Sequence, residues 1–400
     1  MRYDVIVVGG GPAGATAARG LAKAGARVLL LERRRLPRYK ACGGCLSRRV
    51  EKLLDIDPAG LIEERITGLT FTYRGREPIE AAFAAPVAYM VWRDRFDQAL
   101  CLSAAAAGAE LRDGGTVRAV RQVDSRVEVD VNGEREAGDF LVGADGACGV
   151  VARDLFPARR KARAIGLDAD LPLAGAAEAA LKGRVVIELG HASGGYCWAF
   201  PKRDVASVGA MVGRTAARSA SRCLEAFLGA GGLGHRSPAR THGALIPLHA
   251  GDSAPLYHGR ALLTGDAAAL VDPLLGEGIY YAILSGQLAA RAILSGERNG
   301  GDLAWYQTAI SAEITPELEA AGRLSRLAYR LPWLWFKALR RRPGAIDFYR
   351  KVLMGEESYR SFADRVWAEI PMPLDLLLRI RIDRGQMGGE RRAREKRRWR

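Results

Sequence analysis

The sequence predicts an α/β protein in which a Rossmann-type unit is intergrown with an antiparallel β-sheet and followed by a helical C-terminal region. Three patterns support this class. The chain opens with a strand, a glycine-rich turn and a helix; short alternating strands fill residues 159–258; and apolar residues recur every three or four positions after Asp302. A chain of 400 residues exceeds one ordinary core, so two intergrown domains are expected.

Residues 3–35 are predicted to form a strand, a turn, a helix and a second strand. The turn has the spacing Gly9-x-Gly11-x-x-Gly14. Gly9 allows a tight turn, Gly11 lets backbone amides approach a pyrophosphate, and Gly14 lets the helix pack closely on the strand. Glu32 closes the second strand, where its carboxylate can accept hydrogen bonds from both ribose hydroxyls. The turn therefore predicts an adenine dinucleotide with an unphosphorylated ribose, either FAD or NAD.

The elements predicted after residue 35 belong either to the Rossmann-type unit or to the antiparallel sheet. Residues 36–47 are too rich in glycine and polar residues for a regular element, so a loop is predicted there, with a helix after it through Leu54. The later elements expected, in chain order, are strands at 68–73 and 77–83, a helix at 93–107, a hairpin within 108–131, strands at 139–146, 184–189, 206–212 and 260–266, and a helix from about residue 278.

A second strand-end segment distinguishes FAD from NAD. Gly265-Asp266 ends an apolar strand and precedes a helix that starts near Gly278, so a carboxylate and a helix N-terminus are expected to lie close together. The carboxylate suits a ribityl hydroxyl, and the helix N-terminus suits the electron-rich edge of a reduced isoalloxazine. Arg93 opens another helix, from which it can reach phosphate or ribityl oxygens. FAD is therefore the predicted cofactor.

Together these segments resemble the p-hydroxybenzoate hydroxylase-like flavoprotein superfamily and, more narrowly, the geranylgeranyl reductase family. The narrower resemblance covers about residues 1–330 and rests on the segments Pro37–Gly44, Arg93-x-x-Phe-Asp97, Gly195–Lys202 and Asp272–Tyr281. The chain departs from the superfamily at Gly149, Ala269 and Leu275, where Ser, Gly and Thr are common. Carried over by position, the resemblance implies FAD contacts at Gly14, Glu32, Cys42, Gly43, Cys45, Arg93, Val117, Asp266, Gly278 and Ile279.

The resemblance implies an FAD-dependent oxidoreductase that reduces C=C double bonds of geranylgeranyl or other isoprenoid chains with hydride from reduced flavin. A flavin monooxygenase or halogenase of the same superfamily is the alternative, and a non-enzymatic flavin-bearing or basic-tailed binding protein is a third hypothesis. A second glycine pattern at 229–234 follows a helix rather than a strand, so no second nucleotide site is predicted. The electron donor is then expected to be external, either NAD(P)H or ferredoxin.

The predicted domains are discontinuous. Residues 1–70, 89–158 and 259–300 are assigned to the FAD-binding domain, residues 71–88 and 159–258 to the antiparallel-sheet substrate domain, residues 301–378 to the helical C-terminal region, and residues 379–400 to a basic tail.

Two groups of side chains are candidates for the chemistry. Cys42-Gly-Gly-Cys45 is open to a redox-disulfide interpretation, but disulfide reductases need a second dinucleotide domain, and a zinc site needs a second cysteine pair, so no metal is predicted. The resemblance instead places Cys42 beside the flavin, where its thiol helps to manage a proton. Tyr196, Trp198 and Phe200 alternate along a strand and therefore share one face, either as core or as the wall of an apolar substrate pocket. Cys42 and Tyr196 are the candidate proton donors.

The net charge of +15 is concentrated at the C-terminal end. The last 22 residues contain ten basic and three acidic side chains, so the rest of the chain is only modestly basic and nucleic-acid binding is not predicted. Residues 331–342 join aromatic side chains to cations, so this segment is either a buried helix end or an anchor at an anionic membrane surface, and the basic tail is either a solvated end or a lipid contact. Without a signal peptide or an apolar run long enough to cross a bilayer, a cytoplasmic, peripherally membrane-associated protein with reduced cysteines is expected.

Overall fold

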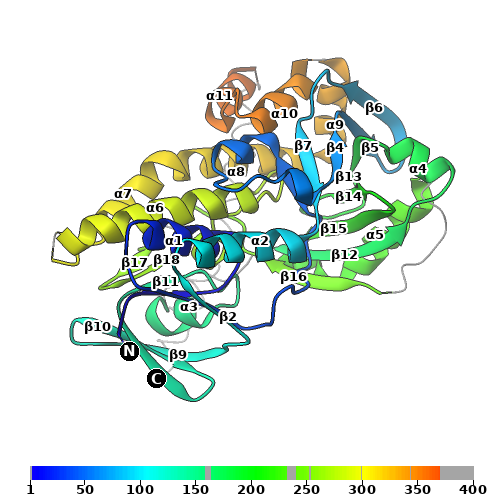
Figure 1. Cartoon of the computed structure of the whole chain (residues 1–400). Coiled ribbons are helices and arrows are strands. Elements are labelled where there is room, and N and C mark those ends of the chain that lie inside the picture. Colours follow the sequence, from blue (N-terminus) through cyan, green and yellow to red (C-terminus); the bar gives the residue numbers. More distant parts are fainter. Residues whose placement is uncertain are drawn as a thin grey trace, which may run out of the picture.

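Two large β-sheets form the framework of the protein (Figure 1). The structure is a computed structural model, and it describes residues 2–157, 164–231, 240–251, 254–298, 300–342 and 344–369. The predicted basic tail, residues 379–400, lies outside the described residues. The prediction of an α/β fold with a second, mainly antiparallel sheet and C-terminal helices is confirmed.

The first sheet has eight strands and a parallel centre in the order β18-β11-β1-β2-β8. Both faces of its central strands are buried, which explains their continuous apolar runs. Strands β9 and β10 form an antiparallel hairpin that extends from β11, and β17 pairs with β18 at the edge. The strands are β1 (Arg2–Val8), β2 (Val28–Glu32), β8 (Glu110–Asp113), β9 (Val117–Val123), β10 (Arg126–Val131), β11 (Glu134–Gly143), β17 (Tyr257–His258) and β18 (Ala261–Leu263).

The second sheet has seven strands in the order β16-β12-β15-β14-β13-β5-β6. Its pairs are antiparallel except for β13 with β5. A separate three-stranded sheet, β3-β7-β4, connects the two. The strands are β3 (Cys45–Ser47), β4 (Ile62–Ile66), β5 (Gly68–Tyr73), β6 (Arg76–Ala82), β7 (Ala88–Val91), β12 (Ala164–Pro172), β13 (Arg184–Leu189), β14 (Cys197–Lys202), β15 (Val205–Gly213) and β16 (His242–Ile246). The domain boundary predicted after residue 70 would divide β5, all of which lies in this sheet. The predicted domain boundaries stay a prediction.

The helices are α1 (Pro12–Lys23), α2 (Arg93–Ala106), α3 (Val150–Leu155), α4 (Ala176–Leu181), α5 (Ala220–Ala230), α6 (Ile279–Arg298), α7 (Ala304–Glu313), α8 (Thr315–Arg330), α9 (Pro332–Arg341), α10 (Gly344–Met354) and α11 (Tyr359–Glu369). The helix predicted after the loop at 36–47 is shorter than expected. It is the 3₁₀ helix Arg48–Lys52.

Helices α1 and α6 lie side by side although 255 residues of sequence, from 24 to 278, lie between them (Figure 1). A Cβ atom added at Gly286 would collide with the carbonyl oxygen of Ala13, and one at Gly20 would lie 3.1 Å from the Cβ of Ala290. Glycine on facing sides therefore lets the two helices approach closely. This packing brings the N-terminal turn and the segment before α6 to one place.

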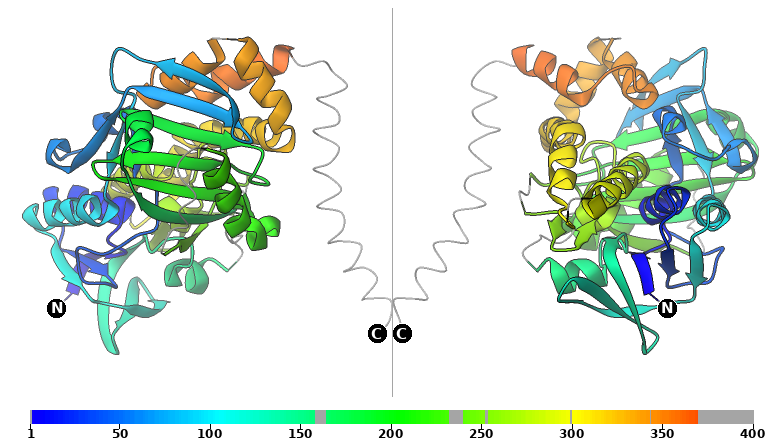
Figure 2. Two further views of the ribbon diagram at one scale, coloured as in Figure 1. Left: turned by 90° about the vertical axis from the view of Figure 1, so that its right-hand side faces the viewer. Right: turned by 60° about the vertical axis from the view of Figure 1, so that its left-hand side comes forward.

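The C-terminal helices pack on one face of the second sheet. A hydrophobic cluster joins side chains of β5, β13 and β14 to those of α8, α9, α10 and α11. Figure 2 shows α10 and α11 at the same end of the molecule as the β5–β6 hairpin, while the N-terminus and the β9–β10 hairpin lie at the other end. The sheet face that carries the predicted aromatic residues is thus covered by the last part of the described chain.

Candidate cofactor and substrate site

The glycine turn between β1 and α1 has the geometry of a pyrophosphate site. Gly9 has a φ of 112°, which favours glycine, and its N–H donates to the Leu31 carbonyl at 2.7 Å. A Cβ at Gly14 would collide with the Gly9 carbonyl oxygen, whereas a Cβ at Gly11 would meet no atom within 4 Å. The turn is therefore tightly packed on the helix side and open at Gly11, where the α1 N-terminus would face an anion. These residues fit the FAD pyrophosphate.

Glu32 is held at the end of β2, directly beside the turn. Its buried carboxylate accepts N–H hydrogen bonds from Gly10 at 3.0 Å and from Arg34 at 3.1 Å. The Gly115 N–H donates to the Glu32 carbonyl at 2.9 Å, which brings the start of β9 at Val117 close to the same strand end. Glu32 and Val117 therefore lie where the adenosine half of the cofactor is expected.

Arg38, Arg93 and Asp97 form a buried ionic network that the sequence did not reveal as such. Asp97 is fully buried. Its carboxylate accepts hydrogen bonds from Nε and Nη2 of Arg93, at 2.9 Å each, and from Nη1 of Arg38 at 2.7 Å. Arg38 also lies 3.5 Å from Glu32. Burial lowers the pKa of Arg93, but the charge of Asp97 outweighs it and the pKa is raised. Arg93 is therefore a fixed cation, and Asp97 is the residue that fixes it.

The loop at residues 36–47, which we call the cysteine loop, crosses from the glycine turn to the second sheet. The Arg93 guanidinium donates to the Cys42 sulfur, and the Gly44 N–H does so at 3.4 Å. A Cβ at Gly43 would lie 2.6 Å from the Phe200 ring and 3.2 Å from Nε1 of Trp198. Cys42 and Gly43 thus lie between the Arg93 cation and the aromatic face of the second sheet.

Cys45 lies on β3 and differs from Cys42 in environment. Burial, with the charges of Glu277 and Cys42, raises the pKa of the Cys45 thiol. All six cysteines are free thiols. No cluster of His, Cys, Asp and Glu suited to a metal ion occurs in the part of the chain that the structure describes.

Tyr196, Trp198 and Phe200 share the sheet face that the cysteine loop covers. Neighbouring rings are 6.1 Å apart between centroids, and all three side chains are buried in the cluster that includes the C-terminal helices. The Tyr196 hydroxyl donates to the Leu275 carbonyl at 2.5 Å, and burial raises its pKa. Within the described residues, Nε1 of Trp198 is buried without a hydrogen-bond partner. The face is apolar but keeps one unsatisfied donor, as expected of a surface that meets a ligand.

Asp266 and the start of α6 lie together, as the sequence predicts. Asp266 is in the 3₁₀ turn Gly265–Ala268, and a Cβ at Gly278 would lie 3.4 Å from its carboxylate. The Gly278 carbonyl accepts the Ala282 N–H at 2.8 Å, so the first helical turn begins here and Ile279 follows it. This second helix N-terminus, with its neighbouring carboxylate, fits the ribityl and isoalloxazine end of FAD.

The loop before α6 is held by side chains that sequence reasoning missed. Asp272 is fully buried and accepts N–H bonds from Leu274 at 2.6 Å and Leu275 at 3.2 Å, with a third bond from the Tyr359 hydroxyl of α11 at 2.5 Å. Burial raises the pKa of Asp272 to about 6. Glu277 in the same loop pairs with Arg49. The C-terminal helices therefore help to fix the loop that precedes α6.

Asp168 and Lys202 add polar groups at one side of the aromatic face. The buried Asp168 accepts the Tyr39 hydroxyl at 3.2 Å and the Cys42 N–H, and burial raises its pKa. Lys202 is buried with Nζ 3.8 Å from the centroid of the Trp92 ring, and burial lowers its pKa. Asp168 therefore ties the cysteine loop to the second sheet, and neither residue was predicted.

The departure at Gly149 has a structural reason. A Cβ at this position would collide with the Asp145 carboxylate, which accepts the Val151 N–H at 3.0 Å. Burial raises the pKa of Asp145 to about 6. Glycine at 149 therefore makes room for this carboxylate at the end of β11.

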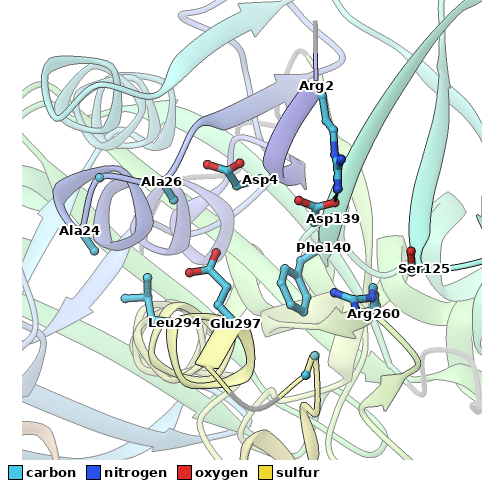
Figure 3. Close-up of a pocket in the computed structure, with 13 residues that line it drawn as sticks. Arg2, Asp4, Ala24, Ala26, Ser125, Asp139, Phe140, Arg260, Leu294 and Glu297 are labelled. Carbon is cyan, nitrogen blue, oxygen red and sulfur yellow. Dashed lines mark hydrogen bonds and ion pairs between the residues drawn. The ribbon is translucent and has the colours of Figure 1, made fainter.

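A pocket of about 520 Å³ lies at the amino ends of the parallel strands and is distinct from this site (Figure 3). Its lining includes Arg2 and Asp4 of β1, Phe140 of β11, and Arg260. Cofactors of doubly wound α/β sheets bind at the carboxyl ends of the strands, where the Gly9 turn is. The pocket is therefore not the FAD site.

Comparison with known proteins supports the same assignment. Residues 2–167 match a family model described as an FAD binding domain. With the glycine turn, Glu32 and the Asp266 segment, this match defines an FAD-dependent flavoprotein oxidoreductase. The chain is 34% identical over 321 residues to geranylgeranyl diphosphate reductase of Rhodobacter capsulatus, covering 75% of this chain and 77% of that protein. It is 30% identical over 354 residues to menaquinone reductase of Mycolicibacterium smegmatis, covering 82% and 84%.

A solved structure, that of a geranylgeranyl bacteriochlorophyll reductase-like protein from Thermoplasma acidophilum, is 25% identical, with a TM-score of 0.69 over 81% of this chain and 88% of that one. The chain belongs to the geranylgeranyl reductase family, and FAD is its cofactor. Among the described helices, none combines the length and the apolar composition needed to cross a bilayer.

Proposed function

We propose that the protein reduces C=C double bonds of geranylgeranyl or related isoprenoid chains. The observation that carries the proposal is the buried aromatic face of Tyr196, Trp198 and Phe200, which lies directly against Gly43 of the cysteine loop. An isolated alkene has no polar handle, so an apolar surface has to position it. The names of the relatives, which include a geranylgeranyl diphosphate reductase and a menaquinone reductase, support an isoprenoid substrate.

In this proposal Gly9, Gly11 and Gly14 bind the pyrophosphate, and Glu32 binds the ribose. The FAD contacts further along the chain are Cys42, Gly43, Cys45, Arg93, Val117, Asp266, Gly278 and Ile279. Bound reduced FAD supplies the hydride chemistry. Residues at the α6 N-terminus and on the aromatic face would hold the isoalloxazine and exclude water from it.

Cys42 is the better placed of the two candidate proton donors. Its sulfur accepts hydrogen bonds from Arg93 and Gly44, and its S–H is not committed to an acceptor among the described residues. The Tyr196 hydroxyl already donates to the Leu275 carbonyl. We therefore assign proton delivery to Cys42 and positioning of the isoprenoid chain to Tyr196, Trp198 and Phe200.

The proposed partners are a prenyl-chain substrate, an external electron donor, which is NAD(P)H or ferredoxin, and a membrane surface from which a lipid substrate is taken. The membrane contact is assigned to residues 331–342 and the basic tail, in a protein of the cytoplasm.

The proposal is tested by anaerobic single turnover. The chemically reduced protein is mixed with geranylgeranyl diphosphate, a geranylgeranylated glycerolipid or menaquinone, and the products are analysed by mass spectrometry. Each bond reduced adds two hydrogens to the substrate. Trp198→Leu should keep FAD and lose most turnover, while Trp305→Leu, at an exposed tryptophan of α7, should keep both. No gain of hydrogen on any of the three substrates would refute the proposal.

A further inference from the structure

Helix α9 presents two large apolar side chains to solvent. Trp333 is 51% exposed and Leu334 is 40% exposed, and they are the only sequence neighbours among the large exposed hydrophobic residues of the described chain. The opposite side of the same helix is buried through Trp335, Phe336 and Leu339. The helix is therefore anchored by its inner face, and its outer face is apolar at the N-terminal turn.

Three cations follow Trp333 along the outer side of α9, where Ala338 is also exposed. Lys337, Arg340 and Arg341 follow Trp333 at intervals of four, seven and eight residues, so they lie on the same side of the helix. The Lys337 ammonium lies 3.8 Å from the centroid of the Trp333 ring. Helix α9 contains no acidic residue, and Arg340 pairs with Glu77 of β6. The outer face thus changes from apolar to positively charged along one short helix.

We propose that α9 is the membrane-docking element, and that its occupant is a bilayer containing anionic lipid. Trp333 and Leu334 enter the boundary of the acyl chains, while Lys337 and Arg341 meet the lipid phosphates. Interfacial helices place apolar side chains in this boundary and Lys or Arg side chains against the headgroups, and the exposed side of α9 carries both kinds.

The inner face of α9 connects this surface to the substrate wall. Trp335, Phe336 and Leu339 belong to the same hydrophobic cluster as Tyr196 and Trp198. The Phe336 ring lies 5.9 Å from that of Tyr73 on β5. A lipid bound at the outer face would therefore be one helix away from the aromatic wall. The role of α9 in delivering an isoprenoid chain rests on the proposed function, but bilayer docking itself does not.

Docking is tested with the full-length protein and large unilamellar vesicles of phosphatidylcholine, with and without phosphatidylglycerol. Vesicles that contain brominated phosphatidylcholine quench the fluorescence of inserted tryptophan. Trp333→Phe should remove most of the quenching, and Trp305→Phe should leave it unchanged. Trp305 is a matched control because it is 39% exposed and also lies near a cation, Arg291, at 5.0 Å.

The charged part of the surface is tested by co-sedimentation. Lys337→Gln with Arg341→Gln should weaken binding to anionic vesicles about fivefold for each charge removed. Arg118→Gln with Arg121→Gln, on β9 at the other end of the molecule, removes the same charge and should leave binding unchanged (Figure 1). Trp333→Ser with Leu334→Ser should weaken binding at least about tenfold.

Quenching that persists undiminished in Trp333→Phe, or equal loss in the two double charge variants, would overturn the assignment. These measurements use neither prenyl substrate nor flavin reduction. If the protein reduces no isoprenoid and still inserts Trp333, the docking surface stands and the proposed function falls. If the protein reduces soluble geranylgeranyl diphosphate and does not bind vesicles, the proposed reduction stands and the docking surface falls.

Discussion

Asp272 provides a quantitative test of how the loop before α6 is held. Its carboxylate is fully buried, and burial raises its pKa from 3.8 to about 6. The Tyr359 hydroxyl, the Leu274 N–H and Arg49 act in the opposite direction, while Glu277 adds to the rise. Because one pKa unit corresponds to about 1.4 kcal/mol, keeping this carboxylate ionised at neutral pH costs the folded state about 3 kcal/mol.

The direction in which Asp272 changes the free energy of unfolding with pH follows from proton binding. The folded state holds the Asp272 proton up to about pH 6, whereas the unfolded chain loses it near 3.8. The unfolded chain therefore binds fewer protons between these values, and the contribution of Asp272 to the free energy of unfolding falls as the pH rises through this range. Below about pH 4 the residue is neutral in both states, and the cost disappears.

Asp272→Asn removes the charge and keeps the shape. The amide oxygen still accepts the Leu274 and Leu275 N–H groups, and its NH₂ group faces the Tyr359 hydroxyl, which then becomes the acceptor. We expect a loss of about 1 kcal/mol from less ideal hydrogen bonds. The variant should then be about 2 kcal/mol more stable than the natural protein near pH 8 and about 1 kcal/mol less stable near pH 4.

The assay is urea denaturation of both proteins across this pH range, followed by circular dichroism. The difference between the two proteins isolates Asp272, because the other carboxylates are common to both. Tyr359→Phe is the matched control: it removes a bond to the ionised form, so it should lower stability at neutral pH by about 1–2 kcal/mol and leave stability near pH 4 less changed. A difference that does not vary with pH would refute the burial of this carboxylate.

Three further predictions concern the cofactor half of the site. Gly14→Ala should yield protein without FAD, because the new Cβ collides with the turn carbonyl; normal flavin absorbance would contradict this. Asp97→Ala should lower the free energy of unfolding by about 3–5 kcal/mol, because two buried guanidinium groups lose their partner. Asp94→Ala on the same helix should lower it by less than about 1 kcal/mol. Equal urea midpoints for the two variants would contradict the ionic network. Asp168→Asn should raise the rate at which iodoacetamide alkylates Cys42, measured by mass spectrometry, whereas Asp170→Asn on the same strand should not; an unchanged rate at Cys42 would show that Asp168 does not hold the cysteine loop.

The parts of the site predicted from the sequence are those whose geometry is local or set by a strand end. The glycine turn and Glu32 lie within one strand–helix–strand unit, so spacing alone indicates their positions. Asp266 and Gly278 follow because ligands of such sheets bind at the carboxyl ends of strands. The fold class, the cofactor and the family are confirmed, and the individual contacts stay a prediction.

The residues that were missed have partners far away in the chain. Asp97 is 59 positions from Arg38, Asp272 is 87 from Tyr359, and Asp168 is 129 from Tyr39. A buried carboxylate needs a compensating donor, but the sequence gives no sign of which one closes on it. The motif that contains Asp97 was recognised, yet only packing shows that this residue fixes Arg93.

Tyr359 belongs to a segment that the family resemblance does not cover. The resemblance to the reductase family extends over about residues 1–330, whereas α9, α10 and α11 lie beyond it. These helices nevertheless complete the cluster around Tyr196 and Trp198, and through Tyr359 they hold the loop that precedes α6. The C-terminal helices therefore contribute to both the aromatic face and the loop that precedes α6, so a change in these helices also reaches the cofactor half of the site.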